Sequence, residues 1–82
     1  MLSTESIKKV GQLIETGQLD EAERVCRNAL ADGTPDAISY INLAHIAYQK
    51  RSVSDAIEHL EAALAIEPDN SPALHNLGVI SD

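Results

Sequence analysis

Residues that could bind a metal ion are few in this sequence. Its histidines are His45, His59 and His75, and its single cysteine is Cys26. A protein zinc site needs three or four side chains that converge on the ion, and two histidines on one helix face stand four residues apart. No two of these histidines have that spacing. We therefore expect neither a metal nor any other cofactor.

Catalytic patterns are also missing. The sequence contains no glycine-rich phosphate loop, no nucleophile elbow and no cysteine–histidine pair in register. Its many carboxylates fall on segments whose pattern is that of solvated helix faces, where they are ordinary surface charge. The sequence therefore predicts a protein that is not an enzyme.

Composition narrows the class of partner. The 82 residues include 6 Lys and Arg against 13 Asp and Glu, a net charge of −7. A surface of this sign repels nucleic-acid phosphates and anionic membranes. No apolar run approaches the roughly 20 residues that span a bilayer, and the first residues do not form a signal peptide. A single cysteine cannot make an internal disulfide. We expect a cytoplasmic protein that binds neither nucleic acid nor membrane.

The chain repeats itself with a period of about 34 residues. A shift of this length places segment 17–31 on segment 51–65, with alanines and leucines in register. The same shift places Asn42 on Asn76. Such a period is typical of helical repeat proteins, in which each unit packs against the next.

Apolar residues within each unit recur at helical spacing, so the expected fold is all-α with about five helices. Their expected ranges are 3–16, 19–32, 36–50, 54–67 and 71–82. Turn residues separate them at Gly17, Gly33-Thr34-Pro35 and Pro68. The expected N-cap residues are Ser3 or Thr4, Asp36, Ser52 or Ser54, and Ser71, with Pro72 as the first residue of the last helix. The third helix carries apolar residues on two faces and should be covered on both.

Residues 37–70 resemble a tetratricopeptide repeat. The family signature W-x2-L-G-x2-Y, A-x3-F and P reads here as Tyr40-x2-Leu43-Ala44-x2-Ala47, then Ala56-x3-Leu60, then Pro68. The resemblance implies a single domain of about two and a half repeats. These are a degenerate first repeat over 3–36, a complete repeat over 37–70, and the first helix of a further repeat over 71–82. The family fold is an α-α superhelix whose first helices line a concave face.

The resemblance also assigns packing roles. Small residues should lie where two helices cross closely, at Ala44, Ala56, Ala63 and Gly78. Tyr40 should pack in the aromatic position of its repeat. Cys26 occupies a position where the family has a large apolar side chain, so we expect a buried and unreactive thiol.

The concave groove follows from the same alignment. Its expected positions are Thr4, Ile7, Lys8, Gly11, Ile14 and Glu15 on the first helix, Ile38, Ile41, Asn42, His45, Tyr48 and Gln49 on the third, and Pro72, His75, Asn76, Val79 and Asp82 on the fifth. Segments 37–49 and 71–81 contain no Asp, Glu, Lys or Arg. We therefore expect a neutral, polar groove and acidic outer helices. Such a groove does not suit a clamp for acidic C-terminal peptides, which needs Lys or Arg.

Asn42 and Asn76 should stand at the same height on neighbouring inner helices. An amide side chain offers two donors and an acceptor, which suits the backbone of an extended peptide. The arrangement is similar to the asparagine ladder of O-linked N-acetylglucosamine transferases. The alternative is that these amides only contact solvent or cap the backbone. The expected function is the binding of a peptide or partner protein by Asn42 and Asn76, with His45, Tyr48, Gln49 and His75 providing selectivity.

Two other functions remain open from the sequence. The fifth helix lacks the second helix of its repeat, so Leu77 and Ile80 should be partly uncovered and could mediate self-association within a longer array. Alternatively, the repeats could recruit substrates for a larger enzyme such as a glycosyltransferase, although no catalytic residue supports this.

Overall fold

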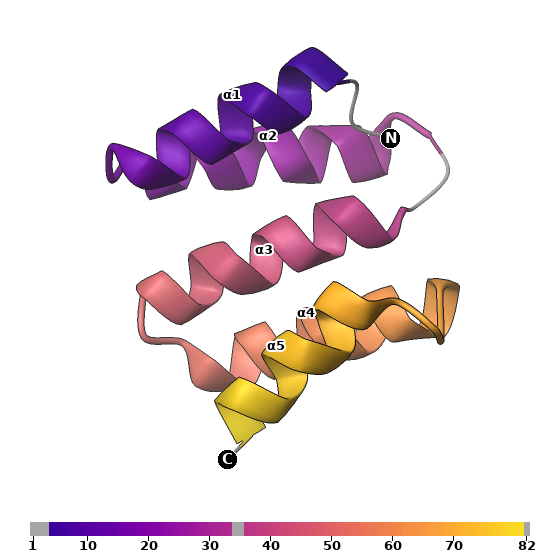
Figure 1. Ribbon diagram of the computed structural model, residues 1–82. Coiled ribbons are helices and arrows are strands. Elements are labelled where there is room, and N and C mark those ends of the chain that lie inside the picture. Colours follow the sequence, from indigo (N-terminus) through magenta and orange to yellow (C-terminus); the bar gives the residue numbers. More distant parts are fainter. Residues whose placement is uncertain (1–3, 34–35, 82) are drawn as a thin grey trace.

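The computed structural model describes residues 4–33 and 36–81, and these residues form five α-helices and no strand. The helices are α1 (Thr4–Glu15), α2 (Leu19–Ala31), α3 (Ala37–Gln49), α4 (Val53–Ile66) and α5 (Ser71–Ser81) (Figure 1). The all-α prediction is confirmed. Ser3, Thr34, Pro35 and Asp82, which were expected to serve as cap, turn or groove residues, lie outside the described residues.

Two apolar clusters hold the helices together, and α3 contributes to both. The first cluster consists of Val10, Leu13, Ala22, Cys26, Leu43 and Ile46, from α1, α2 and α3. The second consists of Ala37, Ala44, Ala47, Ala56, Leu60, Ala63 and Ala73, from α3, α4 and α5. Helix α3 is therefore covered on two sides, as the sequence predicted.

Tyr40 joins the two clusters. Its side chain is partly buried and packs against both of them. Its ring also stacks on His59 of α4, with ring centroids 6.4 Å apart and an angle of 28° between the planes. This confirms the packing role expected of Tyr40, and it adds an aromatic contact that the sequence did not indicate.

Three of the four small residues expected at helix crossings are buried, and one is not. Ala44, Ala56 and Ala63 are at most 2% exposed. Gly78, which occupies the position of Ala44 one repeat later, is exposed, and a Cβ added there would meet no atom within 4 Å. The expectation for Gly78 was wrong because α4 covers Ala44, whereas no described helix packs on the corresponding side of α5.

The turns after α1 and α3 have the same backbone conformation. Gly17 has a φ of +80°, and the amides of Gly17 and Gln18 donate to the carbonyls of Ile14 and Leu13 at 3.2 and 2.8 Å. Arg51, at the same position one repeat later, has a φ of +65° and repeats both hydrogen bonds at its own turn. This pattern is the Schellman motif, which favours glycine because a Cβ is strained at positive φ.

The N-cap of α3 is the one that the sequence predicted. The Asp36 carboxylate accepts hydrogen bonds from the Ser39 amide at 3.3 Å and from the Ser39 hydroxyl at 2.7 Å. Ser52 precedes α4, but its side chain makes no capping hydrogen bond. Ser54 is already inside that helix.

The N-cap of α5 differs from the prediction. Asn70, not Ser71, is the cap, because its Oδ1 atom accepts a hydrogen bond from the Ala73 amide at 2.9 Å. Asparagine caps as well as serine does. Pro72 is still accommodated one residue later than expected, because amides in the first turn of a helix need no carbonyl partner within that helix.

The left-handed turns give a paired stability prediction. Arg51→Gly should raise the free energy of unfolding by roughly 0.5–1 kcal/mol, because it removes a Cβ from a left-handed position. Gly17→Ala should lower the free energy of unfolding by a similar amount for the converse reason. Chemical denaturation of both variants measures these changes. Arg51→Ala is the control, since it removes the long side chain and keeps the Cβ; a gain equal to that of Arg51→Gly would contradict the strain argument.

Candidate functional site

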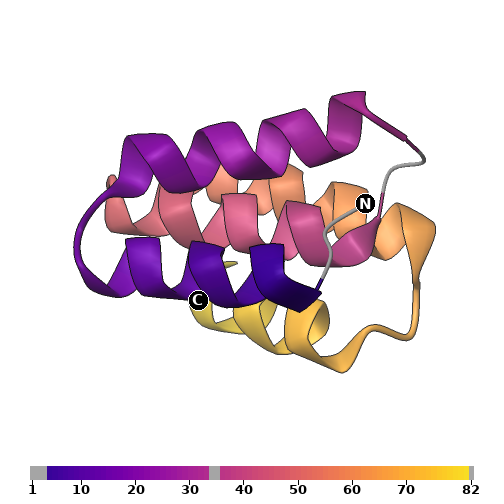
Figure 2. The ribbon, with the colours of Figure 1, turned by 90° about the horizontal axis from the view of Figure 1, so that it is seen from above.

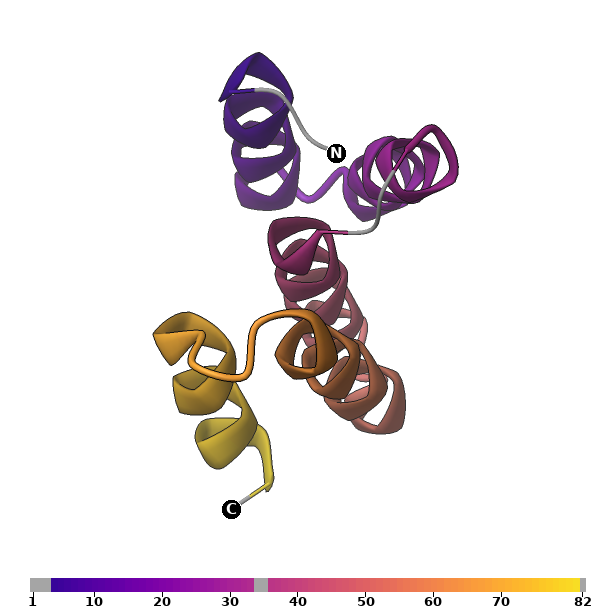
Figure 3. The ribbon, with the colours of Figure 1, turned by 90° about the vertical axis from the view of Figure 1, so that its right-hand side faces the viewer.

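Helices α1, α3 and α5 form one side of the molecule. Figure 2 shows α1 and α5 along one edge and α2 along the opposite edge. Figure 3 shows α1 and α5 on the same side with α3 set back between them. Two cavities open between these helices, one of about 260 Å³ between α1 and α3 and one of about 160 Å³ between α3 and α5. We call this surface the groove.

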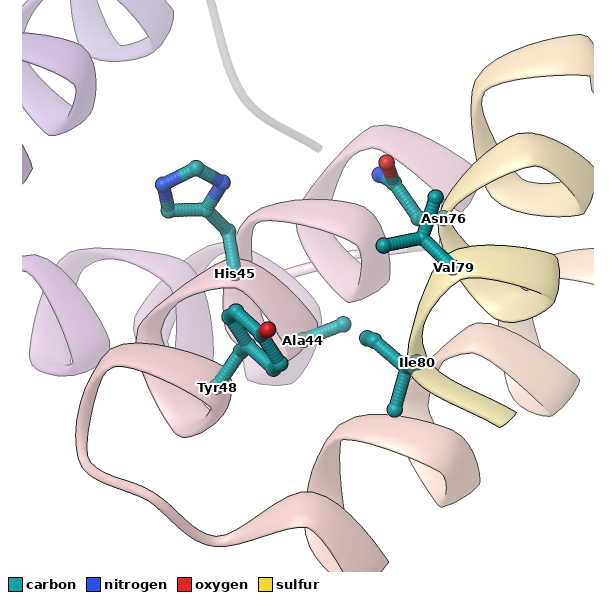
Figure 4. Close-up of a pocket in the computed structure, with 6 residues that line it drawn as sticks. All are labelled: Ala44, His45, Tyr48, Asn76, Val79 and Ile80. Atoms are coloured by element: carbon teal, nitrogen blue, oxygen red, sulfur yellow. The ribbon is translucent and has the colours of Figure 1, made fainter. Parts of the chain in front are cut away.

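The α3–α5 cavity is mainly apolar. It is lined by Ala44, His45 and Tyr48 from α3 and by Asn76, Val79 and Ile80 from α5. In Figure 4, Ala44 and Ile80 point toward each other between the helices, while Asn76 and Val79 extend from α5 toward α3. Tyr48 is 50% exposed and Val79 58% exposed. The cavity therefore offers apolar walls with a phenol, an imidazole and an amide at its rim.

The α1–α3 cavity is more polar. It is lined by Gly11, Ile14 and Glu15 from α1 and by Asn42 and His45 from α3. A Cβ added at Gly11 would meet no atom within 4 Å, so this glycine leaves open space in the middle of the α1 surface. Glu15 is the only Asp, Glu, Lys or Arg among the residues that line the two cavities.

His45 lies between the two cavities and lines both of them. Its Nε2 atom is 2.9 Å from the Nε2 atom of Gln49, one helical turn further along α3. Since an amide nitrogen only donates, the ring nitrogen is the acceptor in this pair. Gln49 thereby orients the ring and leaves Nδ1 as the nitrogen that can donate in the neutral imidazole.

The structure places most of the expected site residues along this groove, but at separate points. Asn42 lies in the α1–α3 cavity and Asn76 in the α3–α5 cavity, so each amide belongs to one step of the groove. Tyr48 lines the second cavity, and Gln49 contacts His45. His75 is exposed and lines neither cavity. A binding role for all six residues stays a prediction.

Sequence reasoning left two cavity residues out of the groove. Ala44 was assigned to helix packing and Ile80 to self-association, but both also line the α3–α5 cavity. The repeat alignment assigns each position either to helix packing or to the groove. It gives no signal for a side chain that packs against a neighbouring helix and also lines a cavity.

The three histidines occupy different environments. His45 lies in the groove, His75 is exposed on α5, and His59 is half-buried on α4 against Tyr40. Burial lowers the pKa of His59, with Arg27 acting in the same direction and the carboxylates of Asp55, Glu58 and Glu23 opposing. The described residues contain no group of three metal-binding side chains.

Cys26 is buried in the first apolar cluster, as the sequence predicted. Burial, together with the Asp36 and Glu23 carboxylates, raises the pKa of this thiol to about 11. The reactive thiolate is therefore strongly disfavoured at neutral pH. Cys26 is a packing residue in this fold.

Ionic contacts of α2 join the two repeats on the face opposite the groove. Lys50, which follows α3, lies 2.5 Å from Asp20 and 3.4 Å from Glu23, and Arg27 lies 2.9 Å from Glu23. Lys50 holds the pKa of Asp20 below its ordinary value. All of these side chains reach solvent, with exposures from 32% for Glu23 to 92% for Asp20, so the pairs contribute little to stability. Arg27 and Lys50 are thus engaged with acidic residues of the same chain.

Comparison with known proteins identifies a family. A family model described as tetratricopeptide repeat matches residues 13–78. No curated protein and no solved structure matches the chain. Within the described ranges, no helix is both long enough and apolar enough to cross a membrane.

His59 gives a prediction for pH dependence. Because its pKa is lowered in the folded state, the folded protein binds fewer protons at this ring than the unfolded chain does. The free energy of unfolding should therefore fall as the pH drops below the ordinary histidine pKa of about 6.5. His59→Gln should show a smaller loss of stability between about pH 7.5 and 5.5, measured by denaturant titration. His75→Gln, on an exposed part of α5, is the control; a wild-type loss of stability in His59→Gln would refute this assignment.

Proposed function

Because this chain belongs to the tetratricopeptide repeat family, we propose that it binds an extended segment of a partner protein in the groove of α1, α3 and α5. Repeats of this family are generally protein–protein interaction modules. The observation that carries the proposal is the presence of two consecutive cavities along these helices, which share His45 as a common wall. The role is one of binding without catalysis.

The amides give this groove a means of holding a peptide backbone. Asn42 and Asn76 stand at equivalent positions of successive repeats, and each lines a different cavity. Packed helices lie about 8–10 Å apart, which is roughly three residues of an extended chain. The two amides are thus suited to hydrogen bonds with backbone groups about three residues apart. Side chains of the bound segment would enter the cavities between these points.

The proposal includes selectivity from the rim. His45 and Tyr48 offer an imidazole nitrogen and a phenol hydroxyl beside the α3–α5 cavity. Gln49 orients the imidazole, and exposed His75 would contact only a ligand that extends beyond the cavity. We place this protein in a reducing compartment such as the cytoplasm, in keeping with a buried free thiol at Cys26.

Removal of both amides tests the groove. Peptides that bind the wild-type protein are first selected from a random display library and then titrated against Asn42→Ala/Asn76→Ala. Affinity should fall roughly 10- to 30-fold, since each hydrogen bond contributes about 1 kcal/mol. Asn28→Ala, on the outer helix α2, serves as control. Unchanged affinity in the double variant would exclude the amide ladder.

A specific observation favours a second function, self-association through α5. Leu74 is 50% exposed on this helix, and the neighbouring surface at Gly78 is open. Leu77 and Ile80, which the sequence assigned to self-association, are partly buried against the second cluster, and Ile80 also lines the α3–α5 cavity. The α5 segment 71–81 carries no Asp, Glu, Lys or Arg, so charge does not keep two copies apart there. We propose that a second copy packs on the side of α5 that carries Leu74 and Gly78.

Light scattering over a wide concentration range tests the contact. The wild-type mass should rise above the 8.8 kDa of one chain as concentration increases. Leu74→Lys/Gly78→Lys should keep the mass of a monomer, because two cations on each copy would repel and both positions are exposed. Ser54→Lys on α4 is the control. A constant wild-type mass of one chain would refute self-association.

A further inference from the structure

The corresponding positions on the three inner helices carry different side chains. Gly11, His45 and Val79 occupy the same position in successive repeats, and each lines the groove. The next groove position along the helix is Glu15 on α1 and Gln49 on α3. The repeat position is thus the same on each inner helix, while the side chain that it presents to the groove differs from one helix to the next.

On α3 the side chains at these two positions form a hydrogen bond with each other, whereas on α1 they do not. Gln49 donates to His45 one turn earlier. Glu15 has Gly11 one turn earlier, which has no side chain and borders open space. Among residues 4–33 and 36–81, no cation lies within 4 Å of the Glu15 carboxylate. The Glu15 carboxylate therefore has no cation beside it in the described part of the chain, and it borders the open space at Gly11. At the same positions of α3, His45 and Gln49 are joined by a hydrogen bond.

The charge of the whole molecule adds to this local feature. The net charge is −7, and the Arg27 and Lys50 cations of the outer face are already paired with α2 carboxylates. Among residues 4–33 and 36–81, the repeat alignment places one other charged residue on the groove, Lys8, about two helical turns or roughly 10 Å along α1 from Glu15. Lys8 does not line the cavity. The potential at the α1–α3 cavity thus favours a cationic group.

The α3–α5 cavity has a different preference. Its walls include Ala44, Val79 and Ile80, and none of its lining residues is Asp, Glu, Lys or Arg. Its volume of about 160 Å³ is close to that of an engineered apolar cavity of about 150 Å³ that binds benzene. A single leucine-sized or phenyl-sized side chain fits a space of this size. The polar side chains of this cavity lie at its rim, so the interior suits an uncharged, apolar group.

We infer that the groove selects a basic–apolar peptide, with an Arg or Lys side chain in the α1–α3 cavity at Glu15 and a large apolar side chain in the α3–α5 cavity. The inference rests on the proposed binding function and specifies its partner. Packed helices generally lie about 8–10 Å apart, and this spacing corresponds to about three residues of an extended chain. We therefore place the two side chains on residues about three positions apart. Gly11 provides the room through which the basic side chain reaches the carboxylate.

Short synthetic peptides test this selectivity. The probes are N-acetylated, C-amidated octapeptides of Ser, Thr and Gln that carry Arg-x-x-Leu or Leu-x-x-Arg, which covers both chain directions. Matched peptides replace Arg by Gln or Glu, or Leu by Ser. Titration of the ¹⁵N-labelled protein followed by amide NMR shifts measures millimolar affinities and shows where each peptide binds. Arg with Leu should bind roughly threefold to tenfold more tightly than Gln with Leu, with shifts in α1, α3 and α5.

Variants of the groove identify the residues responsible. Glu15→Gln should abolish the preference for Arg over Gln and leave the preference for Leu over Ser. Glu21→Gln removes the same charge from the outer helix α2 and should leave both preferences as in the wild type. Val79→Glu, at a position 58% exposed, should abolish the preference for Leu. Gly11→Leu should fill the space beside Glu15 and reduce the Arg preference without altering the charge.

The possible outcomes separate the two levels of the proposal. If no octapeptide shifts the amides of α1, α3 or α5, this inference is overturned. The proposed function falls with it only if the random library also yields no peptide that binds the groove. If peptides bind there but the Arg preference is absent, or is equal in wild type and Glu15→Gln, the binding function stands and the inference is overturned. Equal losses in Glu15→Gln and Glu21→Gln would also overturn it, since they would show an effect of net charge alone.

Discussion

The structure depends on the burial of α3 on two sides. Leu43 and Ile46 belong to the cluster with α1 and α2, while Ala44 and Ala47 belong to the cluster with α4 and α5. Large side chains fill the first contact and small ones permit the close approach of α4. Since a helical hairpin cannot cover its own apolar faces, the α1–α2 hairpin is stable only when it packs against α3 of the next hairpin.

The same constraint leaves one strip of α3 free, and that strip is the groove. Asn42, His45 and Gln49 lie within about 60° of one another on a helix with 3.6 residues per turn. They occupy the arc that neither cluster uses. Packing therefore determines where the groove lies, without determining which side chains stand in it. This explains how Gly11, His45 and Val79 can occupy equivalent positions on the three inner helices.

The elements of the fold were predictable because the repeat period and the turn residues act locally. Helix ranges follow from apolar spacing, and Asp36 caps α3 as its position indicates. Prediction from the sequence failed where a feature depends on which other residues or helices lie next to it. Gly78 was assigned to a close crossing by analogy with Ala44, but no described helix packs there. Asn70 was missed because three adjacent residues, Asn70, Ser71 and Pro72, all suit the start of a helix.

The site was predictable only at the level of positions. The repeat alignment placed Asn42, His45, Tyr48 and Asn76 on the inner helices, and each of them lines a cavity. It offered no reason to separate them from His75, which lines neither, because exposure depends on how far α5 leans from α3. Contacts between distant residues were also hidden. The Lys50–Asp20 pair joins residues 30 apart in sequence and could not be distinguished from ordinary surface charge.

The two interaction surfaces of α5 do not compete. On an ideal helix Leu74 and Gly78 lie about 40° apart, and Asn76 and Val79 about 60° apart, with roughly 150° between the centres of the two pairs. Ala73 and Ile80 occupy the arc on the other side, where they pack into the second cluster with residues of α3 and α4. A second copy on the Leu74–Gly78 side would therefore leave the groove side of α5 open. Self-association would present two grooves in one particle, and a partner with two binding segments would then gain affinity through effective concentration without any new contact within either groove.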